Sequence, residues 1–362
     1  MSAARSRCSQ LAIVLVVLIA LSLAGCELLT GGASSTGGLQ PTPPTHTSDW
    51  YQIYFTDPLS PGAASYRGGP DAALAEAIDR ARLSVDVAIY DLNLWSIRDA
   101  LLAADDRGIS VRVVTESDNL DEPELNALKE AGIPVLGDRR EGLMHNKFVI
   151  IDQADVWSGS MNFTVTDGYR NNNSLVFIRS SRLAEDFEAE FEEMFTKDVF
   201  GASSNDTPYP ILNLDGTRLE VYFSPDDGTA QHILDWISSA QQSIDFMAYS
   251  FTSKEIASAM LERAQAGIAV RGIFEAAQYR TNIGTQFDRL RQAGLDVRLD
   301  GNPNNMHHKV IIIDQRVVIM GSYNFSNSAE NRNDENTLIV SSADWAAQYM
   351  QEFDRLFAQA GN

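Results

Sequence analysis

Two short segments of this 362-residue chain carry histidine and lysine at the same spacing, followed by the same small and polar residues. Residues 144–163 read MHNKFVIIDQADVWSGSMNF, and residues 306–325 read MHHKVIIIDQRVVIMGSYNF. The segments align without a gap at an offset of 162 residues. The chain has five histidines, and two of them occupy this one repeated position. Such a repeated polar set predicts a single site built from two related halves.

The residue types in both segments suit chemistry on a phosphodiester. Histidine and lysine stand two positions apart on a predicted strand, so their side chains leave the same face. Cationic and amide groups would bind the phosphate oxygens, one imidazole would attack phosphorus, and the other would protonate the leaving group. A purely structural role for each histidine is the alternative, and the repetition of every polar position argues against it. The candidate residues are His145, Lys147, Ser160 and Asn162 in the first copy and His307, Lys309, Ser322 and Asn324 in the second.

Each motif also contains an aspartate five positions after its lysine. On a regular strand, Asp152 and Asp314 fall on the face opposite that lysine. We group them with the catalytic motif and expect them to orient or brace the site rather than to react. No cluster of Asp, Glu and His with metal-ligand spacing accompanies the motifs. The sequence therefore predicts catalysis with no metal and no cofactor.

The N-terminal segment predicts export and anchoring rather than a folded core. Two arginines precede an apolar stretch at residues 11–21, which is short for a stable membrane span. Residues 23–26 read LAGC, which resembles the signal of bacterial lipoproteins, in which the cysteine, here Cys26, is lipidated. Residues 1–25 would then be a signal peptide and residues 26–48 a flexible Gly-, Ser-, Thr- and Pro-rich tether. We expect an exported protein held on the bacterial cell envelope by this lipid; an ordinary signal peptide or an uncleaved anchor is the alternative.

The remainder of the chain is a tandem duplication that extends well beyond the motifs. SVDVAIYDL at residues 84–92 matches SIDFMAYSF at residues 243–251. In each half, patterns typical of strands and helices alternate, which predicts an α/β fold with a sheet covered on both faces. Helices are predicted at residues 71–81, from about 96 to 108, at 122–131 and at 230–240. We place the domains at residues 49–200 (lobe 1), 201–217 (linker) and 218–362 (lobe 2).

His-x-Lys-x4-Asp followed by Gly-Ser-x-Asn, twice in one chain, resembles the phospholipase D superfamily over about residues 50–360. The resemblance implies two α/β/α sandwich lobes, each a mixed sheet flanked by helices, related by a pseudo-twofold axis with the active site between them. Such a chain would be a monomer with an internal pseudo-dimer. The resemblance also implies that one histidine forms a covalent phosphohistidine without metal, while the other acts as acid and then as base. The lysine and asparagine pairs would hold the phosphate.

The two halves differ at one position that bears on these roles. Members of the superfamily often carry an acidic residue, some distance after the motif, that orients a histidine of the opposite lobe. Glu335 matches this position in lobe 2, and Asn173 stands at the equivalent position in lobe 1. By resemblance, Glu335 would bond Nδ1 of His145 and leave its Nε2 free to attack. His307, facing the neutral Asn173, would be the acid.

Composition limits the substrate without deciding it. The net charge of −21 excludes the broad cationic face of a protein that coats duplex DNA, although a local basic pocket is compatible with it. The expected lipid anchor favours hydrolysis or transfer of membrane phospholipids. An endonuclease acting on DNA or RNA is the first alternative, supported by the AYSFTS stretch at residues 248–253, which looks like the small nucleases of the superfamily. A non-catalytic surface binding module is the second alternative, which the completeness of both motifs disfavours.

Overall fold

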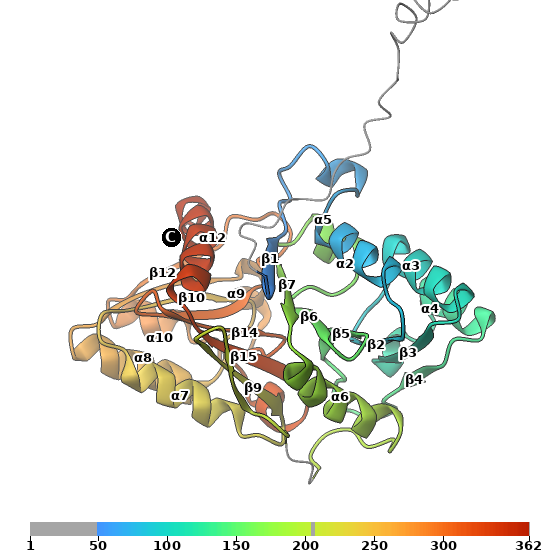
Figure 1. Ribbon diagram of the computed structural model, residues 1–362. Coiled ribbons are helices and arrows are strands. Elements are labelled where there is room, and N and C mark those ends of the chain that lie inside the picture. Colours follow the sequence, from blue (N-terminus) through green and yellow to red (C-terminus); the bar gives the residue numbers. More distant parts are fainter. Residues whose placement is uncertain (1–48, 204–206, 362) are drawn as a thin grey trace, which may run out of the picture. The chain divides into compact units, whose positions relative to one another are not determined.

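Two mixed β-sheets form the framework of the part of the chain that the structure, a computed structural model, describes: residues 49–203 and 207–361 (Figure 1). Seven strands follow an equivalent order in both sheets, and sheet 2 has an additional edge strand. Sheet 1 has the order β1-β7-β6-β5-β2-β3-β4, and sheet 2 has the order β12-β11-β10-β13-β14-β15-β9-β8. The strands of sheet 1 are β1 (Tyr51–Phe55), β2 (Ser84–Ile89), β3 (Ser110–Thr115), β4 (Val135–Gly137), β5 (Lys147–Ile151), β6 (Asp155–Gly159) and β7 (Ser174–Arg179). Those of sheet 2 are β8 (Ile211–Leu214), β9 (Thr217–Ser224), β10 (Ser243–Ala248), β11 (Ala269–Phe274), β12 (Asp296–Leu299), β13 (Lys309–Ile313), β14 (Val317–Gly321) and β15 (Glu335–Ser341). The predicted pair of α/β lobes is confirmed.

Helices cover the outer face of each sheet. Leucine and isoleucine side chains of α2, α3 and α4 pack on the outer face of sheet 1, and those of α7, α8 and α10 pack on sheet 2. The helices of lobe 1 are α2 (Pro70–Asp79), α3 (Trp95–Asp106), α4 (Pro123–Ala131), α5 (Val165–Tyr169) and α6 (Ser181–Phe195). Those of lobe 2 are α7 (Thr229–Ser239), α8 (Lys254–Gln265), α9 (Ala276–Thr281), α10 (Phe287–Gln292), α11 (Asn327–Asn331) and α12 (Ala343–Gln359). Each helix predicted from the sequence is present, with bounds that differ by one or two residues.

The C-terminal helix of each lobe, α6 or α12, belongs to a core that both sheets share. This core contains inward-facing residues of β5 and β13 together with the apolar faces of α6 and α12. Phe187 of α6 makes edge-to-face ring contacts with Phe148 of lobe 1 at 4.9 Å and with Phe223 of lobe 2 at 5.1 Å. Burying one such side chain contributes roughly 1.5–3 kcal/mol. The shared core therefore holds the two lobes at a fixed separation, which the site between them requires.

Two boundaries differ from the predictions. The segment expected to be a linker, residues 201–217, contains β8, which pairs with β9 as the edge strand of sheet 2. The strand is short, and two prolines precede it in the segment, so the sequence did not predict this hairpin. Strands β5 and β13 begin at Lys147 and Lys309, so the histidines precede the strands rather than lying within them.

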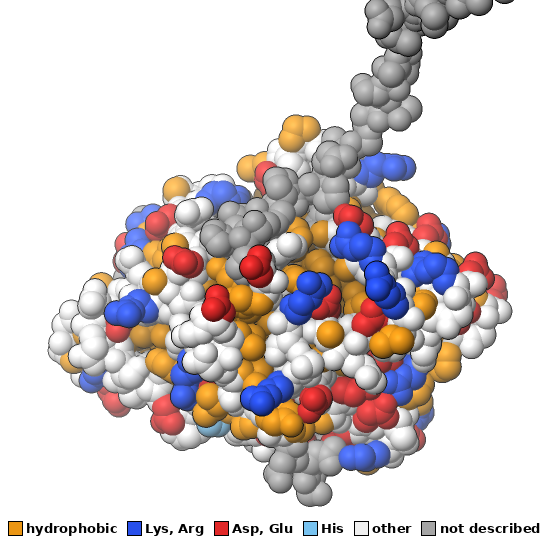
Figure 2. All heavy atoms as spheres, viewed as in Figure 1, with side chains coloured by type: hydrophobic (Ala, Val, Ile, Leu, Met, Phe, Trp, Pro, Cys, Tyr) orange, Lys and Arg blue, Asp and Glu red, His pale blue; other side chains and the backbone are white. Residues whose placement is uncertain are grey.

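The described residues include no helix long and apolar enough to cross a membrane. Cys26, the predicted signal peptide and the predicted tether lie outside the described residues, so these expectations remain predictions. On the face shown in Figure 2, acidic and basic side chains are interspersed among hydrophobic ones.

Candidate active site

Backbone pairing with the opposite lobe brings each motif histidine to the interface between the lobes. The N–H of His145 donates to the carbonyl of Asp334 at 3.0 Å, and the N–H of Asp334 donates to the carbonyl of Leu143 at 2.9 Å. In the other half, the N–H of His307 donates to the carbonyl of Asn172 at 2.8 Å. These bonds explain why the strands begin only at the lysines: the preceding backbone pairs across the interface instead of within its own sheet.

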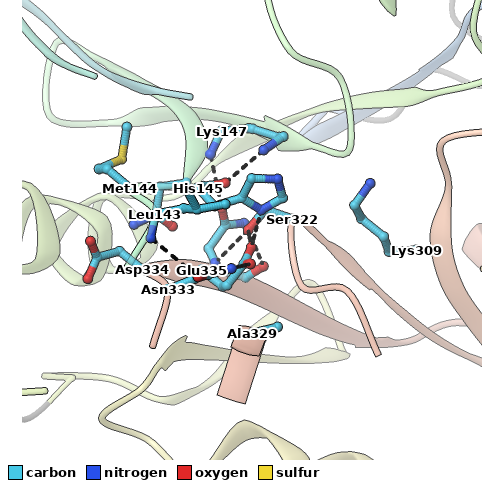
Figure 3. A network of polar contacts seen from close by, with 12 residues as sticks. Leu143, Met144, His145, Lys147, Lys309, Ser322, Ala329, Asn333, Asp334 and Glu335 are labelled. Atoms are coloured by element: carbon cyan, nitrogen blue, oxygen red, sulfur yellow. Dashed lines mark hydrogen bonds and ion pairs between the residues drawn. The ribbon is translucent and has the colours of Figure 1, made fainter. Parts of the chain in front are cut away.

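Glu335 of lobe 2 contacts His145 of lobe 1 directly. Its Oε2 lies 2.7 Å from Nδ1 of the imidazole and also accepts a hydrogen bond from the Ser322 hydroxyl at 2.6 Å, while Asn333 donates to Oε1 at 3.1 Å (Figure 3). Glu335 is fully buried, so these donors and the imidazole fix its position. A carboxylate at Nδ1 keeps the proton on that nitrogen and leaves the lone pair on Nε2. No described group forms a hydrogen bond to Nε2 of His145.

His307 meets a neutral group at the same atom. The amide oxygen of Asn173 lies 2.9 Å from Nδ1 and also accepts from the Ser160 hydroxyl at 2.9 Å. A carboxylate that the sequence analysis did not identify, Asp167 of α5, has Oδ2 3.5 Å from the same Nδ1. The histidines thus have different partners, as the difference between residues 173 and 335 predicts.

The serines of both Gly-Ser-x-Asn segments bind these orienting residues. Besides donating to Glu335, Ser322 Oγ accepts from the N–H of Asn336 at 3.0 Å, and Ser160 Oγ accepts from the N–H of Ser174 at 3.1 Å. Both serines are fully buried. Their predicted contact with a substrate phosphate stays a prediction. In the structure, their hydroxyl groups orient the side chains of residues 335 and 173.

Two lysines and two tyrosines line the same region. Lys147 Nζ donates to the carbonyl of His145 and Lys309 Nζ to that of His307, both at 2.8 Å. Each ammonium group lies over a tyrosine ring, Tyr90 at 5.2 Å and Tyr249 at 4.8 Å, and each ring packs edge-on against the adjacent imidazole. Both lysine side chains are 1% exposed. Two almost completely buried lysine ammonium groups beside two imidazoles form a site suited to an anion.

Burial and mutual repulsion set the protonation of these groups. Burial lowers the pKa of His145 well below its usual value, and Lys147 and Lys309 lower it further. Burial likewise lowers the pKa of Lys147 to about 8, while Glu335 acts in the opposite direction. Burial raises the pKa of Glu335 to about 7, although both lysines and its hydrogen-bond donors oppose that shift. At neutral pH the His145 ring is therefore uncharged, and in molecules with an ionised Glu335 its Nε2 is unprotonated, as a nucleophile must be.

The asparagines of both motifs, Asn162 and Asn324, follow strands β6 and β14 and are partly exposed. Their amide oxygens are buried and accept no hydrogen bond among the described residues.

The glycine that begins each Gly-Ser-x-Asn segment allows the close approach of a neighbouring strand. A Cβ at Gly159 would lie 2.2 Å from the carbonyl oxygen of Ser174, and one at Gly321 would lie 2.2 Å from that of Asn336.

The motif aspartates lie at the far ends of β5 and β13, away from the histidines. Asp152 and Asp314 begin the three-residue loops that connect β5 to β6 and β13 to β14, and their φ angles are 55° and 53°, in the left-handed region. Asp314 accepts hydrogen bonds from the backbone N–H groups of residues 241–243 at 2.6–3.1 Å, and Asp152 does the same for residues 82–84. Although grouped with the catalytic residues, they do not reach the histidines; they brace the sheet, which is the bracing role expected of them.

Three residues of the site were missed from the sequence: Tyr90, Tyr249 and Asp167. The tyrosines lie in the repeated segments SVDVAIYDL and SIDFMAYSF, so their repetition was the available signal. Asp167 is not repeated, because the residue 162 positions later is Ala329. A search for shared positions passes over such a residue.

Comparison with protein families finds one that matches both lobes. The family described as "Cardiolipin synthase, PLD-like domain" matches residues 74–195 and 233–357. These segments contain both His-Lys motifs, and the second contains Glu335.

Individual relatives match shorter stretches. The mitochondrial cardiolipin hydrolase of Chlamydomonas reinhardtii is 34% identical over 140 residues, which are 39% of this chain and 62% of that protein. A phospholipase D of Rickettsia bellii is 32% identical over 148 residues, which are 40% of this chain and 72% of that protein. Among solved structures, the phosphatidylserine synthase of Haemophilus influenzae matches 90% of this chain and 89% of its own, with a TM-score of 0.66 and 14% identity. This last likeness shows a shared fold over both lobes.

Proposed function

Because this chain belongs to the family of phospholipase D-like domains, we propose that it is a phosphodiesterase that acts on membrane phospholipids through a covalent phosphohistidine. The observation that carries the proposal is the pairing of His145 Nδ1 with Glu335 at 2.7 Å, with no described group bonded to Nε2 and two buried lysines beside it. This arrangement places a nucleophile next to the cationic groups that bind the negatively charged phosphate.

The first step forms the phosphoenzyme. A phosphodiester binds with its oxygens against Lys147 and Lys309, and its negative charge raises the proton affinity of the adjacent imidazoles. Nε2 of His145 attacks phosphorus while the bond from phosphorus to the leaving oxygen breaks, and His307 gives that oxygen a proton. Glu335 stabilises the positive charge that develops on the attacking ring.

The second step releases the phosphate product. Neutral His307 takes a proton from a water molecule or an alcohol, whose oxygen attacks phosphorus as the bond to His145 Nε2 breaks. Water gives hydrolysis, and an alcohol gives transfer of the phosphatidyl group. After either reaction, His145 is neutral and His307 is protonated, as they were before the first step.

Two observations and one prediction support a phospholipid rather than another phosphodiester. The matching family and the relatives above carry names that refer to cardiolipin or to phospholipase D. The predicted lipid on Cys26 would hold the enzyme at its substrate, in the cell envelope. The net charge of −21 disfavours the broad cationic face of a protein that coats duplex DNA, although it is compatible with a local basic pocket.

The test compares two substrate classes with one preparation. Detergent-purified wild type and His145→Ala are incubated with phosphatidylethanolamine–phosphatidylglycerol vesicles and, in parallel, with single- and double-stranded DNA. We expect release of the headgroup from the vesicles by the wild type only. DNA cleavage with a steep salt dependence and no lipid turnover would make the chain a nuclease, and turnover of neither substrate would favour a binding module.

A further inference from the structure

The two lobes carry their buried carboxylates at different positions of the same local framework. Lobe 2 has Ala329 on α11 and Glu335 at the start of β15, whereas lobe 1 has Asp167 on α5 and Asn173 just before β7. Each pair is six residues apart, and the two pairs align at the same offset of 162 residues. The carboxylate that lobe 1 lacks at position 173 is therefore present six residues earlier, as Asp167 of α5. Figure 3 labels Ala329 on α11, in the lobe that supplies Glu335.

Asp167 is held close to His307 by contacts that leave it ionised. It is 3% exposed, its Oδ2 accepts from the N–H of Asn162 at 2.8 Å, and its Oδ1 accepts from Asn171 Nδ2 at 2.5 Å. Oδ2 lies 3.5 Å from His307 Nδ1, beyond a direct hydrogen bond but within ion-pair range. Asn173 completes the arrangement: its Nδ2 donates to the backbone carbonyl of Asp167 at 3.1 Å, which turns its oxygen towards the imidazole.

We propose that Asp167 is the counter-ion of His307 and holds the positive charge of that ring whenever it carries the proton of the reaction. On this view Asn173 fixes the ring and Asp167 supplies the charge, whereas Glu335 does both for His145. The proposal rests on the function proposed above and assigns a positioning role to Asp167, which does not touch the substrate.

The charged groups around His307 explain why it requires a counter-ion. Burial, Lys309, Lys147 and His145 all lower the pKa of His307, and Asp167 is the group that raises it. Burial would raise the pKa of Asp167, but His307, its hydrogen-bond donors and Lys309 together hold it below its usual value. A general acid must hold a proton before it can donate one, so in this cationic setting His307 depends on the carboxylate.

The chemistry that depends on this charge is the proton movement alone. As phosphorus–oxygen bond cleavage proceeds, protonated His307 gives its Nε2 proton to the leaving oxygen and becomes neutral. It regains a proton from the attacking water in the second step. Asp167 stays a carboxylate throughout, so its removal should matter most when the leaving oxygen is strongly basic.

The test varies the leaving group. Rapid-quench measurements of phosphoenzyme formation use two phosphodiesters that differ only in leaving group, p-nitrophenol or an unactivated alcohol. For Asp167→Asn we expect roughly a 10²-fold loss with the alcohol and less than about threefold with p-nitrophenol. The control is Asp186→Asn, which alters a buried carboxylate of α6 that accepts from the N–H of Tyr209 and should behave as wild type with both substrates.

A rescue variant separates charge from structure. Asp167→Ala with Asn173→Glu copies the Ala329–Glu335 pattern of lobe 2, and we expect it to recover the alcohol substrate to within about tenfold of wild type, while Asp167→Ala alone does not. Equal losses on both substrates for Asp167→Asn, or no recovery by a folded double variant, would overturn the counter-ion role and leave the proposed function standing. A wild type inert on both substrates would instead overturn the proposed function.

Discussion

Ionisation of Glu335 should control the rate of attack by His145, and the pH profile can show this. Burial raises the pKa of this carboxyl to about 7. Above that pH the carboxylate accepts the Nδ1 proton of His145 and leaves Nε2 free. Below it the protonated carboxyl donates to Nδ1, which places the ring proton on Nε2 and removes the nucleophile. A group whose pKa is raised in this way therefore switches activity off as the pH falls.

The expected size of the effect follows from the titration. With a pKa of about 7, about one tenth of the molecules hold an ionised Glu335 at pH 6 and about nine tenths at pH 8, so this ionisation alone should raise kcat/KM about tenfold between them. Lys147, whose pKa is about 8, is half deprotonated at pH 8, which reduces the observed rise to about fivefold. Glu335→Gln keeps an oxygen that accepts from Nδ1 but loses the charge. We expect it to be slower by roughly 10²–10⁴-fold and to lose this limb of the profile.

The assay is kcat/KM for a p-nitrophenyl phosphodiester between pH 5.5 and 8.5. Glu116 is the necessary control, because burial raises its pKa to about 7 as well and its Oε2 accepts from the N–H of Met144 at 3.0 Å, next to His145. Glu116→Gln should keep the limb. If Glu335→Gln retains the limb and Glu116→Gln loses it, the assignment of the titrating group to Glu335 is wrong.

The remaining predictions concern stability, location and metal. Gly321→Ala would place a Cβ 2.2 Å from the carbonyl oxygen of Asn336; thermal unfolding should show a loss of about 1–3 kcal/mol. Gly361→Ala, with no atom of a described residue beyond its chain neighbours within 4 Å of its added Cβ, should unfold as wild type does. Cys26→Ser should abolish palmitate labelling and release the protein from the membrane fraction; a wild type that is membrane-bound but unlabelled would indicate an uncleaved anchor. Activity should be complete in excess EDTA, because lysine ammonium groups stand beside both imidazoles; a loss that Mg²⁺, Ca²⁺ or Zn²⁺ restores would rule out the metal-free mechanism.

What the sequence predicted well depended on repetition and periodicity. The duplicated motifs identified His145 and His307, and each motif lysine lines the same region as its histidine, although the histidine precedes the strand. Alternating patterns typical of strands and helices placed the helices to within one or two residues. The pairing of Glu335 with His145 came from the family resemblance, and the distance of 2.7 Å is what that pairing requires.

What the sequence could not predict depended on contacts between distant segments. The histidine backbones pair with the opposite lobe, which no local pattern reports, so the strands were expected to begin too early. Asp167 reaches His307 from 140 positions earlier in the chain, and its counterpart Ala329 shows that this carboxylate is not part of the repeat. The hydrogen bonds of the serines to residues 173 and 335 were not predicted, because these residues become neighbours of the serines only in the folded sheet.

Covalent capture of the phosphoryl group tests the central claim most directly. Wild type, His145→Ala and His307→Ala are each mixed with a p-nitrophenyl phosphodiester, quenched at high pH, and digested for mass spectrometry of acid-labile phosphopeptides. We expect the adduct on the peptide that holds His145, none in His145→Ala, and accumulation in His307→Ala, because hydrolysis of the phosphoenzyme then lacks its base. An adduct on the peptide that holds His307, with none on that of His145, would contradict the account.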